Sequence, residues 1–179
     1  MIADALVGFG SSVQLLNFAD TNMTAQGFRA LITTLRSNHD LHTLILDNND
    51  LGTPYSFQAI SGLIASTAKF KVLSCANCRL SDTFGVPFAE ALKTNRGLER
   101  FNFHGNELTS RTLRHLAQAF KELAGSLKSF NLGKNGLGDE GGVKLGDSLK
   151  WLSTLESVNL SDNEFKDETG EAICRSLME

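Results

Sequence analysis

The sequence predicts an α/β fold, a right-handed curved solenoid of six repeats with parallel strands on its concave inner wall and helices on its convex outer wall. Three observations support this prediction. The composition, with 41% hydrophobic and 21% charged residues among 179, is typical of one packed domain. A Leu-rich pattern recurs every 28 or 29 residues. Inside each repeat, the apolar spacing changes from that of a strand to that of a helix.

Each repeat opens with a segment that predicts a short strand. Residues 41–51 match the pattern L-x-x-L-x-L-x-x-N-x-L in full. Three and five residues after the start of each repeat, every residue is apolar or Cys, so we expect these side chains in the core. The six repeats start at Val13, Leu41, Phe70, Leu98, Leu127 and Leu155.

A turn follows each strand, and its central residue is the ninth of the pattern. Four repeats carry Asn there, whereas the other two carry Thr21 and Cys78. A buried amide can satisfy backbone groups of its own turn and of the neighbouring repeat. We therefore expect the asparagines to form a ladder through the stack. They are Asn49, Asn106, Asn135 and Asn163.

The second half of each repeat predicts a helix on the outer wall, because apolar residues recur four positions apart. Pro54 and the acidic pairs at 139–140 and 167–168 mark helix starts. Pro87 lies well inside the corresponding segment of the third repeat. We therefore expect the third helix to begin late, near Val86.

We predict one repeat domain over residues 1–179 that forms part of a longer array. Residues 2–10 are similar to the tail of a preceding helix, and residues 174–179 end before the strand that should follow. Terminal repeats of a solenoid need a polar outer face. The apolar Ile2, Leu6 and Leu177 therefore predict end repeats that are less stable or that pair with other protein.

Charge and hydropathy exclude two classes of partner. The 17 basic and 20 acidic residues give a net charge of -3, which leaves no basic excess to hold nucleic acid or an anionic membrane. No apolar run approaches the ~20 residues of a membrane span, and the amino terminus lacks the basic start of a signal peptide. We expect a cytoplasmic protein without nucleic-acid partners or membrane insertion.

The sequence predicts no catalytic, cofactor or metal site. Residues 136–141 read G-x-G-x-x-G, a nucleotide-binding spacing, but the repeat register accounts for each of them. Cys75 and Cys78 form a C-x-x-C pair without the second pair that a zinc site requires. We expect both, together with Cys174 on an inner helix face, to be buried and reduced, as in the cytosol. The four His residues share no face.

The remaining candidate is a partner-binding surface on the inner wall. Leu15, Ile45 and Val72 occupy strand positions that should face solvent, and a partner could cover such an apolar cluster. The middle repeats are net basic along this wall, which could set the register of an acidic surface. The alternative is that these residues are ordinary surface residues. Scattered exposed apolar side chains are common, and mixed charges keep a solenoid soluble without any partner. The candidate basic residues are Arg100, His104, Lys128 and Lys134.

With these repeats, residues 13–179 resemble the leucine-rich repeats of the ribonuclease-inhibitor type. Residues 132–141, LGKNGLGDEG, are especially similar to the consensus of that family. The resemblance implies a full α-helix in each repeat and a non-enzymatic surface that holds another protein. The strict alternation of Asn and Cys repeats is missing, because only Cys78 takes the ninth position. A Cys-rich vertebrate ribonuclease inhibitor is therefore not expected.

Among proteins with this repeat, the irregular ladder positions Thr21 and Cys78 are similar to those of the CARMIL family, linkers of capping protein and myosin I in the actin cytoskeleton. This resemblance implies a scaffold that recruits myosin I or other actin-associated proteins. Ran GTPase-activating proteins are an alternative, although their acidic tail is absent. A third alternative is the ligand-binding end of an innate sensor, which would need a nucleotide-binding domain elsewhere.

Overall fold

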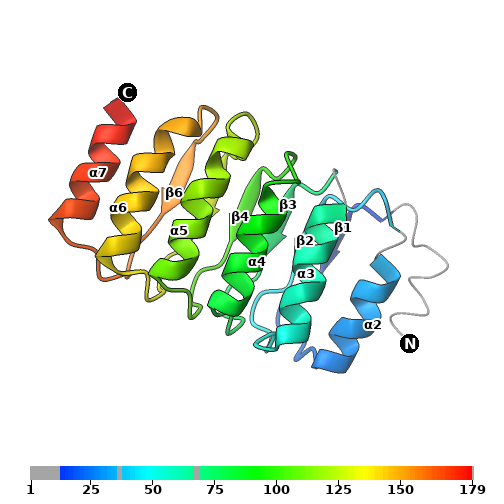
Figure 1. Ribbon diagram of the computed structural model, residues 1–179. Helices are drawn as coiled ribbons and strands as arrows, with labels where there is room; N and C mark the ends of the chain where they lie inside the picture. The colour runs from blue at the N-terminus through cyan, green and yellow to red at the C-terminus, as the bar shows by residue number, and fades with distance from the viewer. Residues whose placement is uncertain (1–12, 36–37, 67–68, 179) are drawn as a thin grey trace.

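The computed structural model describes residues 13–35, 38–66 and 69–178. Strands and helices alternate along the chain, and the helices lie side by side in one layer in front of the strands (Figure 1). The strands are β1 (Leu15–Asn17), β2 (Thr43–Ile45), β3 (Val72–Ser74), β4 (Arg100–Asn102), β5 (Ser129–Asn131) and β6 (Ser157–Asn159). The helices are α2 (Ala25–Leu35), α3 (Pro54–Ser66), α4 (Asp82–Leu92), α5 (Ser110–Ala119), α6 (Gly138–Ser148) and α7 (Asp167–Met178), with the short helices η1 (Phe120–Leu123) and η2 (Leu149–Trp151) after α5 and α6.

The six strands form one parallel sheet in chain order, β1 to β6. Each strand begins two residues after a repeat start, and equal repeat positions pair across the sheet, as Leu15 does with Thr43 and Arg100 with Ser129. The predicted solenoid fold is therefore confirmed. None of the described helices is both long enough and apolar enough to cross a membrane.

The core lies between the sheet and the helix layer. Strand residues three and five positions after the repeat starts, such as Leu44 and Leu73, are fully buried in the inner repeats. In the third to fifth repeats, aromatic rings replace many of the leucines. Phe88 meets Phe103 edge to face with ring centroids 4.7 Å apart, and Phe101 stacks on Phe130 at 5.3 Å. Such ring pairs add directional contacts to apolar burial. The strands of these repeats therefore lie on a closely packed aromatic core.

The asparagine ladder is present and joins successive repeats. The Asn106 side-chain oxygen accepts hydrogen bonds from the backbone N–H groups of Cys78 and Leu80 in the preceding repeat, at 3.0 and 2.9 Å. Its amide nitrogen donates to the carbonyls of Cys75 and Phe103. With a longer bond to the His104 carbonyl, one buried side chain therefore satisfies five backbone groups in two repeats, which would otherwise each carry a desolvation penalty.

Two carboxylates tie helix starts to the following repeat. Asp82 accepts hydrogen bonds from the backbone N–H of Thr109 at 3.0 Å and from the Thr112 hydroxyl at 2.6 Å. Burial alone would raise the pKa of Asp82, but the hydrogen bonds from these threonines outweigh it and hold the pKa below its ordinary value. Two repeats further on, Asp139 accepts a hydrogen bond from the Thr169 hydroxyl. These bonds fix the lateral position of neighbouring helices.

The expected late start of the third helix is wrong, because α4 begins at Asp82 and contains Pro87 in its interior. The proline removes the hydrogen bond that its N–H would give to the carbonyl of Thr83. Both residues are exposed, so solvent can satisfy that carbonyl. Phe84, which precedes the proline, is fully buried, and its burial favours the helical turn ahead of Pro87. Pro54 does begin α3, as predicted.

The predicted burial of the cysteines holds for Cys75 and Cys78 but is wrong for Cys174, which is exposed. The position of Cys174 in its repeat packs against the next helix along the stack. In the preceding repeat the same position is Gly146, and a Cβ built there would lie 2.9 Å from the Cβ of Ala172. No further helix covers α7 in the described residues, so the thiol of Cys174 faces solvent.

The same flank of α7 exposes apolar side chains. Leu177 is 70% exposed, whereas Leu149 at the same position of the preceding repeat is 4% exposed. The lower stability of this end repeat, or its pairing with other protein, stays a prediction, and the exposure of Leu177 is its geometric basis. The corresponding expectation for Ile2 and Leu6 lies outside the described residues.

We expect a soluble thiol reagent to label Cys174 rapidly, and Cys75 and Cys78 only in denaturant. Burial raises the pKa of the Cys78 thiol to about 11 and that of Cys75 well above its ordinary range, and only the thiolate reacts quickly. Mass spectrometry of the labelled peptides provides the measurement. A Cys174→Ser variant is the control and should show no rapid labelling. Fast modification of Cys75 or Cys78 in the native protein would refute the expectation.

Candidate functional site

The candidate site is the face of the sheet that points away from the helices, which we call the concave face. Leu15 pairs in register with Thr43, and Thr43 pairs with Val72. Since neighbouring strands lie about 4.8 Å apart, the Leu15 and Val72 backbones lie about 10 Å apart. Ile45 follows Thr43 by two residues and therefore shares its face. Leu15 is 59% exposed, and Ile45 and Val72 are half-buried. The structure thus brings the three predicted apolar anchors together on β1 to β3.

One of the predicted steering cations shares a carboxylate with a second lysine. The Lys128 Nζ atom lies 2.8 Å from the carboxylate of Glu99, and the Lys71 Nζ atom lies 2.9 Å from the same carboxylate. Hydrogen bonds from Lys128 and Lys71 lower the pKa of Glu99 to about 2, so Glu99 stays ionised at every physiological pH. One carboxylate therefore compensates only part of the charge of the two lysines, and the cluster keeps a net positive charge.

The other predicted basic residues do not form one cluster. Arg100 is exposed, with its guanidinium 3.8 Å from the carboxylate of Glu156. His104 is half-buried, and its Nδ1 atom has no hydrogen-bond partner in the structure. Lys134 is exposed, and no carboxylate pairs with it in the part of the chain that the structure describes. Arg100 and Lys128 lie at the starts of strands, whereas His104 and Lys134 lie beyond strand ends. The structure therefore places two of these basic residues at the amino-terminal ends of the strands and two beyond the carboxyl-terminal ends.

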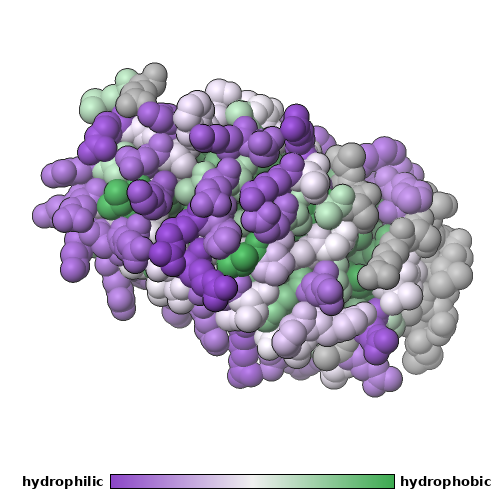
Figure 2. All heavy atoms as spheres, in the orientation of Figure 1, coloured by the Kyte–Doolittle hydropathy of each residue, from purple (hydrophilic) through white to green (hydrophobic). Residues whose placement is uncertain are grey.

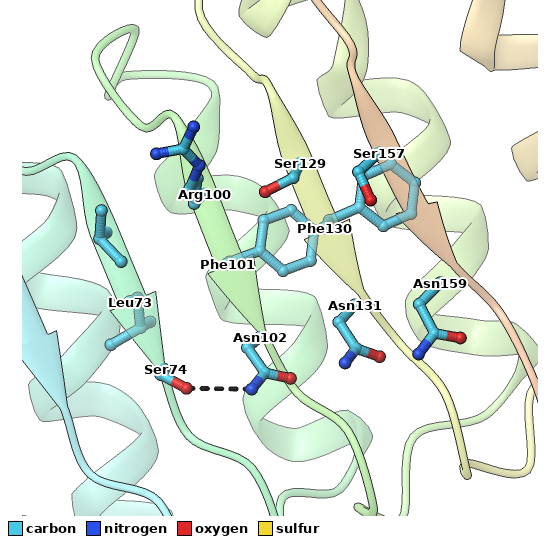
Figure 3. Close-up of a pocket in the computed structure, with 11 residues that line it drawn as sticks. Leu73, Ser74, Arg100, Phe101, Asn102, Ser129, Phe130, Asn131, Ser157 and Asn159 are labelled. Atoms are coloured by element: carbon cyan, nitrogen blue, oxygen red, sulfur yellow. Dashed lines mark hydrogen bonds between the residues drawn. The ribbon is translucent and has the colours of Figure 1, made fainter.

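A hollow of about 360 Å³ with both apolar and polar lining residues covers β3 to β6 on the concave face. Figure 3 shows Asn102, Asn131 and Asn159 in one row across adjacent strands, with Ser129 and Ser157 in a second row. We name this set of three asparagines and two serines the amide row. Sequence reasoning did not select them, although Asn recurs at the fifth repeat position of the last three repeats. That recurrence was the available signal.

Hydrogen bonding inside the amide row leaves donors free. The Asn131 and Asn159 side-chain oxygens accept hydrogen bonds from the backbone N–H groups of Gly133 and Ser161, at 2.9 and 3.0 Å. These bonds fix the amide planes, since each oxygen is held by its own strand end. The amide nitrogens of Asn131 and Asn159 have no partner among the described residues, unlike that of Asn102, which donates to Ser74 at 3.1 Å.

The concave face therefore combines two recognition chemistries. The β1 to β3 half offers apolar side chains, and the β3 to β6 half offers fixed N–H donors, two hydroxyls and the Arg100 guanidinium. Donors of this kind match backbone carbonyls and carboxylates. Across residues 13–35, 38–66 and 69–178, no three His, Cys, Asp or Glu side chains are grouped to hold a metal ion. The arrangement is suited to holding a protein surface.

The parallel strands, the buried asparagine ladder and the helix layer are those of the leucine-rich-repeat fold. The family model described as "Leucine Rich repeat" matches residues 126–146 and 152–174. Mouse (Mus musculus) ribonuclease inhibitor is 26% identical over 158 residues, which cover 88% of this chain and 35% of that protein. Protein CARMIL of Dictyostelium discoideum is 24% identical over 170 residues, which cover 94% of this chain and 16% of that protein. The chain thus spans about a third or less of the length of these relatives.

The fold is also that of a solved structure. The C-terminal domain of Caenorhabditis elegans tropomodulin superposes with a TM-score of 0.68 over 84% of this chain and 91% of that one. The identity is 18%, so the similarity concerns the fold alone.

We expect Glu99→Gln to destabilise the protein at neutral pH but not in strong acid. The pKa of Glu99 falls from 4.5 to about 2 on folding, so its contribution is complete above pH 4.5 and is lost as the pH falls through about 2. An exposed network of this kind contributes about 1 kcal/mol, or about 2–4 °C in Tm. Thermal unfolding between neutral and acidic pH measures the difference from wild type.

Glu107→Gln is the matched control, because Glu107 is exposed and forms no ion pair among the described residues. Its Tm should follow wild type at every pH. An equal loss for both variants, or a loss for Glu99→Gln that persists at the most acidic pH, would contradict the assignment.

Proposed function

We propose that this domain is a non-enzymatic, cytoplasmic protein-interaction scaffold whose concave face holds an actin-associated partner. The observation that carries the proposal is the juxtaposition of Leu15, Ile45 and Val72 with the amide row on one sheet. A partner that lies along the wall would bury apolar side chains at one end and satisfy donors at the other. The concave face would then select a partner by both its shape and its polarity.

Rigidity favours this use of the wall. The three anchors lie on β1, β2 and β3. The strand β1 pairs with one neighbour, β2 and β3 each pair with two, and all three cover a core of buried leucines and phenylalanines. Little conformational entropy remains to be lost when such side chains are covered. Full burial of an aliphatic side chain contributes about 1.5–3 kcal/mol, and Leu15 at 59% exposure has the largest area left to bury.

The choice of partner rests on resemblance. The irregular ladder at Thr21 and Cys78 and the relation to Protein CARMIL support an actin-cytoskeleton linker, for which myosin I is the first candidate partner. The alternative is a regulator of the Ran GTPase-activator type, which would position the machinery of a GTPase.

We expect Ile45→Asp to raise the Kd for the purified myosin I tail at least tenfold, because it places a charge in the apolar cluster. Leu15→Asp should act in the same direction, and the exposure of Leu15 makes unfolding a minor concern. Lys134→Glu should mainly slow association with an acidic surface and weaken its salt dependence. Surface plasmon resonance at two salt concentrations measures these effects.

Lys93→Ala is the control, because Lys93 follows α4 on the helix side and pairs with Glu90. It should bind as wild type does. If the concave variants bind normally and Lys93→Ala does not, the concave assignment is wrong. If the wild type does not bind myosin I but accelerates GTP hydrolysis by Ran, the alternative replaces the proposal.

A further inference from the structure

A second hollow, of about 470 Å³, lies on the helix side of the molecule, between α5–η1 and α6–η2. We call it the Trp151 groove. Small side chains leave room in it, since Ala117 comes from α5 and Ser148 from α6. On the helix side seen in Figure 2, hydrophilic side chains predominate toward the α5 to α7 end of the stack. The other lining residues are Arg114, Gln118, Lys121, Lys144, Asp147 and Trp151.

Trp151 is the sole tryptophan of the sequence and is 44% exposed. The repeat does not require an aromatic residue here, because the same position is Ala65, Thr94 and Glu122 in earlier repeats. Two cations pack against its ring, with the Lys121 and Lys150 Nζ atoms 5.0 and 5.9 Å from the ring centroid. A partly exposed indole held by cations is the kind of side chain that dominates binding energy at protein interfaces.

The charges of the groove do not cancel. Arg114 pairs with Glu140 at 2.9 Å, and Asp147 pairs with Arg175 at 3.4 Å. For Lys121 and Lys144, no carboxylate partner occurs within residues 13–35, 38–66 and 69–178. Two cations without a carboxylate partner among the described residues therefore line the groove, although the chain as a whole carries a net charge of -3.

We propose that the Trp151 groove binds an acidic, extended protein segment. Carboxylates of the segment would pair with Lys121 and Lys144, and an apolar side chain would pack on the Trp151 ring over Ala117. One feature favours a peptide over an anionic lipid surface. The site is a hollow between two helices, which an extended segment can enter and a flat lipid surface cannot.

The groove and the concave face lie on opposite sides of the sheet (Figure 1). The helix layer separates them, so occupancy of one does not obstruct the other. The inference therefore goes beyond the proposed function and stands without it. A domain with both sites would join a partner on the strand side to an acidic segment on the helix side.

The test uses a blocked oligoglutamate peptide with one central leucine. Because Trp151 is the sole tryptophan, selectively excited indole emission reports on this one site. The peptide should change the emission saturably, and rising salt should weaken the effect. An oligolysine peptide of the same length should leave the emission unchanged.

Variants are measured by the anisotropy of a dye-labelled copy of the peptide. Trp151→Ala should raise the Kd about tenfold or more, and Lys144→Glu about threefold or more through lost attraction and new repulsion. Lys166→Glu is the matched control, since it makes the same charge change at an exposed residue outside the groove, and should bind like wild type. Circular dichroism checks that each variant is folded.

Three results would overturn the proposal. One is equal affinity of wild type, Trp151→Ala and Lys144→Glu for the peptide. Another is an equal loss for Lys144→Glu and Lys166→Glu, which would reveal a general charge effect. The third is binding to phosphatidylserine vesicles without binding to the peptide, which would assign the groove to a lipid surface. Ile45→Asp, which tests the concave face, should leave peptide binding unchanged.

Discussion

The structure depends on how buried asparagines satisfy the backbone where each strand turns toward its helix. A turn that follows a three-residue strand leaves polar groups inside the stack, and no regular secondary structure can pair them. Asn106 makes three donor and two acceptor contacts, shared between two repeats. Where the position is Cys78, its thiol still donates to the Leu46 carbonyl of the preceding repeat, at 3.2 Å. Successive repeats thus meet at a fixed spacing.

Fixed spacing is what turns short strands into recognition surfaces. Because equal positions pair in register, a residue type that recurs in the sequence becomes a row in space. The three asparagines of the amide row are such a case, and the equal positions Leu15, Thr43 and Val72 form a row of mixed residue types. On the helix side, Asp82 and Asp139 hold neighbouring helices in place. The groove between α5 and α6 is therefore set by the same repeat geometry as the concave face.

The repeat period of the sequence predicted the positions of the strands and the residues of the core. All six strands lie two residues after the repeat starts, and the apolar columns are the core. The errors occurred where a residue's environment depends on a neighbour rather than on its own repeat. Cys174 has a buried position in the pattern but no helix beside it in the described chain. The late start predicted for the third helix considered only the hydrogen bond that Pro87 cannot donate. The burial of Phe84 favours a helical turn ahead of the proline, so α4 begins at Asp82. The pairing of Lys71 and Lys128 with one carboxylate, that of Glu99, likewise depends on side-chain positions that the repeat pattern does not contain.

The functional residues are those that the repeat leaves free. A strand position that faces the core must be apolar in every copy, whereas a position that faces out can carry Leu15 in one repeat and Ser157 in another without cost to the stack. Trp151 takes a position that Ala65 and Glu122 fill equally well, so its indole serves no purpose common to the repeats. An aromatic side chain held by two cations at such a position is explained more directly by contact with another molecule than by folding.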